Sequence, residues 1–326
     1  MSSYWSGYPD LEEKLDSVRT VIEQKMHIRN QSIERAVVSL NNAGGKYLRP
    51  AFFFLFAAFG DAPKIGKDQL VTAAASLEVL HLATLVHDDV IDDSPLRRGQ
   101  VTIQSHFGKD VAVYTGDLLF TVFFDLLLES MSGSPYLRVN AKTMKKILLG
   151  ELEQMSTYHN QEQTIHGYLR TAAGKTAALF KLAAREGAYF GGADVDTIRL
   201  AGHVGFYIGI AFQMIDDLLD YTEDKEALNK PVLEDISQGI YNLPLICALQ
   251  KNPAVFRPYL DKQQAMTVED VEAVVYLMKK EGGLEEARML AARFTQKAVA
   301  VIAQLPLHPA KDRLLQMTER LLERSS

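Results

Sequence analysis

Nearly every long segment of this 326-residue chain repeats its apolar residues at spacings of three and four positions. Such spacing places them on one face of an α-helix, whereas a half-buried β-strand needs alternation. The sequence has no alternating stretch of useful length and no Asn-Gly or Asp-Gly hairpin signal. Helices are therefore predicted over residues 8–41, 51–59, 69–87, 111–131, 139–158, 168–190, 195–221, 243–249, 268–281, 284–303 and 311–324.

Short Gly- and Pro-containing segments separate these helices, and no low-complexity linker or fixed-period repeat interrupts them. With 47% apolar and 23% charged residues, the chain has the composition of an ordinary globular protein. Disordered, collagen-like and disulfide-scaffold proteins are excluded. We predict an all-α fold, with a single domain over residues 1–326 and ten or more helices.

Charge and cysteine content narrow the possible partners and the compartment. The net charge is −6 and no basic face is evident, which argues against a nucleic-acid binder. Cys247 is the only cysteine, so neither an internal disulfide nor a cysteine-rich zinc site is possible. A reducing cytoplasm is the expected location.

The sequence shows neither a signal peptide nor a long unbroken apolar run. The first ten residues have no basic region followed by an apolar one. The most apolar run, residues 51–59, is far shorter than the roughly 20 residues that a membrane span needs. We expect a soluble protein without a membrane span.

Two aspartate-rich motifs end long apolar segments. The first contains Asp88, Asp89, Asp92 and Asp93, and the second contains Asp216, Asp217 and Asp220. On a helix, the first and last aspartates of an Asp-Asp-x-x-Asp motif lie one turn apart on one face and repel each other. One such motif is as often a solvated helix end as a site, but two after apolar segments favour a hard cation. Magnesium is held by one or two carboxylates together with substrate phosphates.

Basic residues near the first motif could bind those phosphates. Lys46 and Arg49 lie in a Gly-Gly-Lys segment, and Arg97 with Arg98 follows the motif by a few residues. Arginine can donate two parallel hydrogen bonds to a pair of phosphate oxygens, and lysine contributes a single positive charge. Gly174-Lys175-Thr176 is not a nucleotide-binding P-loop, because Leu169 stands where that loop needs glycine and no strand precedes it.

Together these residues resemble the trans-isoprenyl diphosphate synthases, the all-trans polyprenyl synthetase family of medium- and long-chain type. The resemblance covers residues 30–324, and its elements follow the family's order. They are Gly44-Gly45-Lys46-x-Leu48-Arg49-Pro50, Asp88-Asp89-x-x-Asp92 with Arg97-Arg98-Gly99, Gly116-Asp117, Gly150-Glu151 with Gln154, Lys175-Thr176, and Phe212-Gln213-x-x-Asp216-Asp217-x-x-Asp220.

The resemblance implies a helical bundle around a central cavity, usually a homodimer, in which the two motifs face each other. It implies a prenyltransferase of isoprenoid biosynthesis that joins isopentenyl diphosphate to an allylic diphosphate, with about three Mg²⁺ ions and no organic cofactor. A heterodimer with a small second subunit is a further possibility. The seven motif aspartates account for the chain's acidity, so a basic protein partner is not required.

The resemblance also assigns roles to individual residues. The metal ligands are Asp88, Asp92 and Asp216, with Asp89, Asp217 and Asp220 in support and Lys175 as a further catalytic residue. The isopentenyl diphosphate site comprises Lys46, Arg49, His81 and Arg98, and the allylic site comprises Arg97, Lys175, Thr176, Gln213 and Lys230. For His81 and Gln213, burial with internal hydrogen bonding is the alternative. His87 is interpreted as structural.

Three positions depart from the family pattern. Tyr47 stands where arginine is usual, Asn229 precedes Lys230 in place of glycine, and Ile240 replaces a lysine. None of the three removes a metal ligand. We therefore expect catalysis, with weaker binding of the allylic diphosphate.

Small residues before the first motif bear on product length. By resemblance, the product grows back along this helix from Asp88, past Thr84, Ala83 and Leu80. Thr84 and Ala83 would not block a chain as phenylalanine would, and Leu80 lies roughly 12 Å from Asp88 along the helix. We expect about six to eight isoprene units, C30–C40. Geranylgeranyl length stays open, and close helix packing is the alternative explanation for the small residues.

Two other functions share parts of this pattern. A class I terpene cyclase normally has one aspartate motif and no isopentenyl site, so Lys46, Arg49 and the second motif argue against it. A non-catalytic regulatory homologue would usually have lost aspartates, whereas both motifs are complete here.

Overall fold

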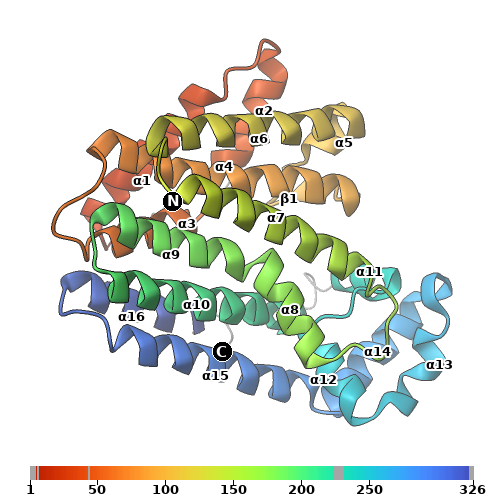
Figure 1. Ribbon diagram of the computed structural model, residues 1–326. Helices are drawn as coiled ribbons and strands as arrows, with labels where there is room; N and C mark the ends of the chain where they lie inside the picture. Colours follow the sequence, from red (N-terminus) through yellow and green to blue (C-terminus); the bar gives the residue numbers. More distant parts are fainter. Residues whose placement is uncertain (1–4, 6, 43–44, 223–230, 323–326) are drawn as a thin grey trace. The chain divides into compact units, whose positions relative to one another are not determined.

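The computed structural model describes residues 5, 7–42, 45–222 and 231–322. Most of these residues are helical (Figure 1), which confirms the predicted all-α class. The chain forms two compact units, residues 1–140 with 183–198 and residues 141–182 with 199–326. The single domain and the central cavity stay predictions.

The first unit is built on two long antiparallel helices. Its elements are α1 (Pro9–Lys25), α2 (Gln31–Asn42), α3 (Leu48–Ala57), α4 (Lys67–Ile91), β1 (Leu96–Arg97), β2 (Gln100–Val101), α5 (Ile103–Phe107), α6 (Lys109–Met131) and the start of α7 (Tyr136–Met155). Helix α4 packs along α6, and α1 and α3 pack on α4. Fully buried aromatic rings, such as Phe52, Phe56 and Phe123, fill this core.

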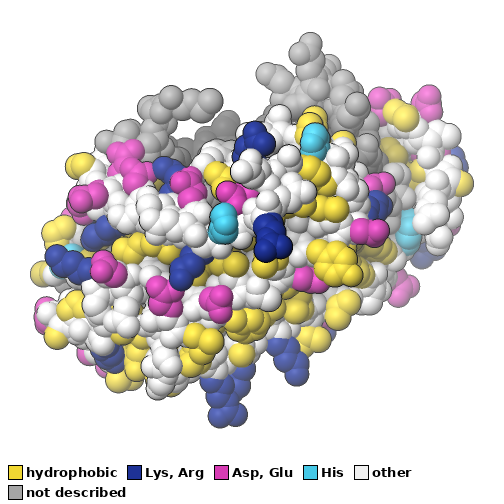
Figure 2. Space-filling model, turned by 90° about the horizontal axis from the view of Figure 1, so that it is seen from above, with side chains coloured by type: hydrophobic (Ala, Val, Ile, Leu, Met, Phe, Trp, Pro, Cys, Tyr) yellow, Lys and Arg dark blue, Asp and Glu magenta, His cyan; other side chains and the backbone are white. Residues whose placement is uncertain are grey.

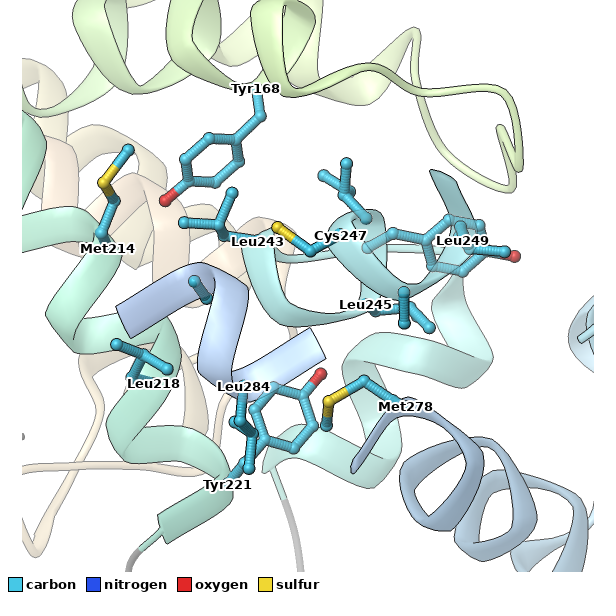
Figure 3. Close-up of a cluster of buried hydrophobic side chains, with 14 of the residues drawn as sticks. Tyr168, Met214, Leu218, Tyr221, Leu243, Leu245, Cys247, Leu249, Met278 and Leu284 are labelled. Carbon is cyan, nitrogen blue, oxygen red and sulfur yellow. The ribbon is translucent and has the colours of Figure 1, made fainter. Parts of the chain in front are cut away.

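The second unit contains the C-terminal helices. Its elements are α8 (Ile165–Lys175), α9 (Ala177–Gly191, shared with the first unit), α10 (Val195–Thr222), α11 (Pro231–Gln238), α12 (Leu243–Lys251), α13 (Arg257–Leu260), α14 (Val268–Lys280), α15 (Gly283–Ile302) and α16 (Pro309–Leu322), with short 3₁₀ turns at Pro253–Val255 and Gln263–Ala265. Its core surrounds α12, which is buried along most of its length (Figure 3). Met214 and Leu218 of α10 contribute to this core, together with Tyr168 of α8.

The helix predicted over residues 8–41 is two helices, and that boundary was wrong. Helix α1 ends at Lys25 and α2 begins at Gln31. The side-chain oxygen of Asn30 accepts hydrogen bonds from the backbone N–H groups of Ser32 and Ile33, at 3.0 and 3.4 Å. An asparagine in this position satisfies N–H groups that begin a new helix. No glycine or proline marks this break, which is why periodicity alone missed it.

The helix predicted over residues 168–190 is also divided. Helix α8 ends at Lys175, Thr176 has φ −110° and ψ −55°, and α9 begins at Ala177. The break falls at a predicted substrate-binding pair and therefore bears on the site.

A two-residue antiparallel hairpin, absent from the prediction, pairs Leu96 with Val101 and Arg97 with Gln100. Its turn places Arg98 and Gly99 at φ 52° and 76°. The sequence lacks the alternation of a longer strand, so a ladder this short could not be recognised. The hairpin fixes the backbone of the two arginines that follow the first aspartate motif.

Three helices, α4, α6 and α10, are long and apolar enough to cross a membrane by length and composition. The sequence-based expectation considered only unbroken apolar runs and overlooked them. Of the apolar window of α4, 72% is buried within the protein, compared with 44% for α6. The apolar character of α4 is accounted for by its place in the core.

Candidate active site

The first aspartate motif lies at the C-terminal end of α4. Asp88 is partly buried, while Asp92 is exposed and caps the helix, its N–H donating to the Asp88 carbonyl at 2.8 Å. The C-terminal end of a helix carries partial negative charge, so carboxylates are unfavourable there. Two carboxylates one turn apart at this end therefore repel each other as well.

Asp89, between them, has a different environment. Its side chain is buried, and its Oδ1 accepts a hydrogen bond from Nε of Arg97 at 2.6 Å. Burial raises the pKa of Asp89, while the Arg97 guanidinium acts in the opposite direction. Asp89 therefore holds Arg97 in place.

Positive charge gathers beside the middle of α4. Arg49, in the first turn of α3, and Arg98 are close enough to influence each other electrostatically. Burial lowers the pKa of Arg49 to about 10, so this guanidinium stays charged at neutral pH. Burial also depresses the pKa of His81, and Arg49, Arg98 and Arg97 add to the effect. His81 is therefore a neutral imidazole, able to offer one N–H donor without adding charge.

Glu78, one turn before His81 on α4, belongs to this cluster and was not predicted. Its side chain is 4% exposed, and its Oε2 atom has no hydrogen-bond partner among the described residues. Burial raises its pKa, and Arg49 and then Arg98 oppose that rise. A charged residue inside the apolar segment 69–87 was the available signal, since buried glutamate is rare unless it is paired.

Arg98 reaches back from the hairpin to the segment that carries Lys46. A Cβ atom at Gly45 would lie 3.1 Å from a terminal nitrogen of Arg98. Only glycine leaves ordinary van der Waals room for this approach. The structure thus brings together Arg49, His81 and Arg98, with Lys46 adjacent in sequence to Gly45.

The second motif lies in the last two turns of α10, again at a helix C-terminus. Asp216 and Asp220 are exposed and one turn apart, whereas Asp217 is buried. Asp217 accepts hydrogen bonds from Nε2 of Gln213 at 2.9 Å and from the backbone N–H of Leu243 at 3.1 Å. Asp217 therefore links α10 to the start of α12. Burial raises its pKa to about 6, although the Gln213 amide opposes the rise.

Thr176 and Gln213 form one hydrogen-bonded chain with Asp217. The Thr176 hydroxyl donates to Oε1 of Gln213 at 2.6 Å, and the Gln213 amide donates to Asp217. Of the two interpretations left open for Gln213, the structure displays the internal hydrogen bond. The break between α8 and α9 turns the Thr176 side chain toward α10.

Lys175 ends α8 and is held by groups from α7. Its Nζ lies 2.9 Å from Oε2 of Glu151 and donates to Oε1 of Gln154 at 3.1 Å. A Cβ atom at Gly150 would meet the backbone of Gly174 and Lys175 at about 3 Å, so the two helices approach closely. Gly150, Glu151 and Gln154, which the family resemblance singled out, position Lys175.

His87 is a packing residue, consistent with the structural interpretation. Its ring stacks on Phe120 with centroids 5.3 Å apart, and its Nε2 lies 3.2 Å from Oδ1 of Asp117. A Cβ atom at Gly116 would lie 2.5 Å from the ring. Gly116-Asp117 therefore lets α6 approach α4 just before the first motif.

The residues proposed to set product length lie on two faces of α4. Ala83, one turn before His87, lies on the face that meets α6, and it is fully buried. Thr84, one turn before Asp88, lies on the face of the metal-ligand candidates and is partly buried. Leu80 is also fully buried. Close packing therefore accounts for the small size of Ala83 but does not account for that of Thr84.

Two predictions need separate mention. Lys230, with its neighbour Asn229, lies outside the described residues. Within the described part of the chain, no group of three or more His, Cys, Asp or Glu side chains could by itself hold a metal ion. Each motif instead places two carboxylates one turn apart, Asp88 with Asp92 and Asp216 with Asp220.

Comparison with known proteins places this arrangement in a family. The sequence matches the polyprenyl synthetase family over residues 30–278. It is 35% identical over 308 residues to heptaprenyl diphosphate synthase component 2 of Bacillus subtilis, covering 94% of this chain and 87% of that relative.

Solved structures agree with the sequence match. The fold superposes on geranylgeranyl pyrophosphate synthase from Lactobacillus brevis with a TM-score of 0.95 and 41% identity, covering 99% and 100% of the two chains. Polyprenyl synthase from Caulobacter crescentus, solved with calcium and isoprenyl diphosphate, gives a TM-score of 0.87 at 31% identity, covering 97% and 96%. The chain belongs to the polyprenyl synthetase family and is a prenyl diphosphate synthase, a transferase of prenyl groups.

Proposed function

We propose that this protein condenses isopentenyl diphosphate with farnesyl or geranylgeranyl diphosphate to give an all-trans polyprenyl diphosphate. One observation carries the proposal. In each aspartate motif the first and last carboxylates are one turn apart at a helix C-terminus and are exposed or, for Asp88, partly buried, while the middle one is buried and hydrogen-bonded inside the protein. Each motif thus presents two carboxylates one turn apart on one helix, which could hold a divalent cation together with the diphosphate.

The residues present fit magnesium through Asp88, Asp92 and Asp216, with Asp220 in support, because all four offer hard oxygen ligands. When bound, the metal would neutralise diphosphate oxygens and stabilise charge on the departing pyrophosphate. The calcium and isoprenyl diphosphate complex of the Caulobacter relative supports a divalent ion in this family. The number of ions, about three by resemblance, is part of the proposal.

The chain's cations would divide between the two substrates. Lys46, Arg49 and Arg98 would bind isopentenyl diphosphate, and neutral His81 would donate a hydrogen bond to it. Arg97, held by Asp89, and Lys175, held by Glu151, would bind the allylic diphosphate. Lys230 would join them, while Thr176 and Gln213 would act at the same site through the hydrogen-bonded chain with Asp217.

Ionisation of the allylic C–O bond would give a cation that the double bond of isopentenyl diphosphate attacks. The released pyrophosphate would take the proton lost afterwards, so no protein base is needed. Apolar side chains would exclude the water that could quench the cation.

The proposal can be tested by measuring how much pyrophosphate the purified chain releases from farnesyl diphosphate and isopentenyl diphosphate, with and without magnesium. We expect release only when both substrates and magnesium are present. Asp92→Asn should abolish release, whereas the matched control Asp93→Asn should retain it, because Asp93 pairs with Lys109 at 3.0 Å. Release from farnesyl diphosphate alone would instead indicate a hydrolase or cyclase.

We propose a product of about six to eight isoprene units, C30–C40. The reason is that the small side chains of Thr84 and Ala83 leave the path along α4 open as far as Leu80, roughly 12 Å from Asp88. The heptaprenyl relative supports this range. A geranylgeranyl product is the second candidate, favoured by the similarity to the Lactobacillus enzyme. Reversed-phase chromatography of dephosphorylated products separates the two.

We also propose that two copies of this chain associate through α6. Tyr114, Leu118 and Leu128 lie along one exposed face of α6, and Tyr114 is 76% exposed. Apolar side chains that reach the surface among charged ones are visible in Figure 2. A second copy would cover this face symmetrically. In analytical ultracentrifugation, Leu128→Glu should sediment as a monomer. If the purified chain were inactive and a second protein restored its activity, that result would instead indicate the heterodimer suggested by the component 2 relative.

A cytoplasmic enzyme without a membrane span is the proposed setting. The single cysteine suits a reducing compartment, and burial of most of the apolar window of α4 supports its role as a core helix.

A further inference from the structure

The only tryptophan of the chain lies against the segment that carries Lys46. Trp5 is 5% exposed, and its indole Nε1–H donates a hydrogen bond to the backbone carbonyl of Lys46 at 2.6 Å. Its ring meets Tyr8 edge-on, with centroids 6.4 Å apart. The family match begins at residue 30, so the partners of the Lys46 segment include residues outside the matched region.

The next residue, Tyr47, has an unusual backbone. Its φ of 49° is left-handed, a conformation that costs a non-glycine residue roughly 1 kcal/mol or more unless its surroundings hold it. The Tyr47 hydroxyl donates to Oδ1 of Asn41 at 2.8 Å. The Arg19 guanidinium of α1 lies over the ring, 5.3 Å from its centroid.

These contacts act on the backbone from which two cations project. The hydrogen bond at the Lys46 carbonyl fixes the orientation of the peptide between Lys46 and Tyr47. Arg49 follows two residues later, in the first turn of α3. The N-terminal segment therefore contacts the backbone of this turn directly, although its own side chains carry no group that the resemblance assigns to catalysis.

We propose that Trp5 is a positioning residue of the isopentenyl diphosphate site, because its indole N–H holds the turn from which Lys46 and Arg49 project. The inference rests on the proposed function, since it requires these two cations to bind a diphosphate. A residue that positions a binding group should affect affinity for the ligand of that group more than turnover.

Steady-state kinetics of Trp5→Phe provide the first test, because phenylalanine keeps an aromatic ring while removing the N–H donor together with part of the ring volume. We expect KM for isopentenyl diphosphate to rise about tenfold, the effect of one lost buried hydrogen bond. We expect kcat and KM for farnesyl diphosphate to stay within about twofold. The matched control, Tyr8→Phe, changes an aromatic residue of the same segment and should match the parent.

An unchanged KM for isopentenyl diphosphate in folded Trp5→Phe would overturn the inference. So would equal changes in both KM values together with a lower melting temperature, because that pattern belongs to a residue that only stabilises the fold.

The fluorescence of Trp5 gives a second test in the parent protein, so it does not depend on the folding of a variant. Coupling between two contacts is reciprocal, so isopentenyl diphosphate binding must strengthen the contact between Trp5 and Lys46. We expect saturating isopentenyl diphosphate to reduce acrylamide quenching of Trp5, and Lys46→Ala to remove the reduction.

Calorimetry separates failure of the inference from failure of the proposed function. Isopentenyl diphosphate that binds in calorimetry but leaves quenching unchanged would contradict the role of Trp5. A parent chain that neither binds isopentenyl diphosphate nor elongates farnesyl diphosphate would instead contradict the proposed function.

Discussion

In the first aspartate motif the middle carboxylate, Asp89, faces the guanidinium of Arg97, whereas in the second motif Asp217 faces the amide of Gln213 and a backbone N–H. Both carboxylates are buried, and both follow an aspartate that is less buried, at the C-terminal end of a long apolar helix. Asp89 fixes a cation that is proposed to contact substrate. Asp217 fixes the helix itself, by tying α10 to α12. Identical sequence motifs thus serve two different structural purposes.

Removing outward carboxylates should have the largest effect and should be the same for both motifs. We expect Asp88→Ala and Asp216→Ala each to lower kcat/KM by roughly a thousandfold, because each removes a proposed metal ligand and several kcal/mol of transition-state stabilisation. Raising the magnesium concentration should recover part of the loss. A loss in only one variant would show that the two motifs are not equivalent even at their outward positions.

Removing the middle carboxylates should distinguish the motifs. Asp89→Asn leaves the partly buried Arg97 without its charge partner, so we expect the free energy of unfolding to fall by about 2 kcal/mol. Asp217→Asn keeps an oxygen that can accept from the Leu243 N–H, so we expect a loss below about 1 kcal/mol. Urea unfolding without magnesium measures both. Equal losses would contradict the distinction between guanidinium-held and amide-held carboxyl groups.

Glu186, a buried carboxyl of α9 far from both motifs in sequence, extends the comparison. The Asn140 amide donates to it, and Glu186 Oε2 and Asn140 Oδ1 are both buried without a partner among the described residues. Burial raises the pKa of Glu186 to about 8, so the folded protein keeps its proton where the unfolded chain loses it.

The contribution of Glu186 to the free energy of unfolding should therefore be fully present below about pH 4.5. It should fall by about 1.4 kcal/mol per pH unit as the pH rises to about 8. Glu186→Gln should flatten that slope, whereas Glu151→Gln, which lacks such burial, should leave it. The measurement is urea unfolding between pH 5 and pH 8, each at fixed ionic strength. A parent profile without this slope would show that Glu186 is ionised in the folded state.

The helix that precedes the first motif should affect product length rather than the rate of reaction. We expect both Thr84→Phe and Ala83→Phe to shorten the product, since both would narrow the path along α4. Only Ala83→Phe should also lower the free energy of unfolding, by about 1–3 kcal/mol, because Ala83 is fully buried on the face that meets α6. Product chromatography together with thermal unfolding distinguishes them. If both variants made products of the parent length, α4 would not be the element that determines product length.

Much of the helix content was predictable, because three- and four-residue spacing is a local property that a single segment carries. Two predicted helices are each divided in the structure, at Asn30, where no glycine or proline marks the break, and at Thr176, two residues after Gly174. At Asn30 the signal was a capping side chain that is also common in loops. At Thr176 the break coincides with a hydrogen bond to Gln213, 37 residues away, which no local pattern could reveal.

The candidate site divides in the same way. The aspartate pairs and the cations were recognisable because their residue types and order along the chain are themselves informative. Glu78 and Trp5 were overlooked, since neither belongs to a motif, and each becomes relevant only through neighbours brought close by folding. Trp5 contacts Lys46 from 41 positions away.

The sequence by itself determined the helical class, the two aspartate motifs and the family, because helix periodicity, carboxylate spacing and motif order are all written along one dimension. The tertiary structure alone decided which carboxylates face outward and which partners the buried ones find. Asp89 meets Arg97 through a hairpin turn, and Asp217 meets Leu243 across 26 residues. The physical reason is that a buried charge is tolerable only beside a specific donor, and the folded chain, rather than the local sequence, supplies that donor.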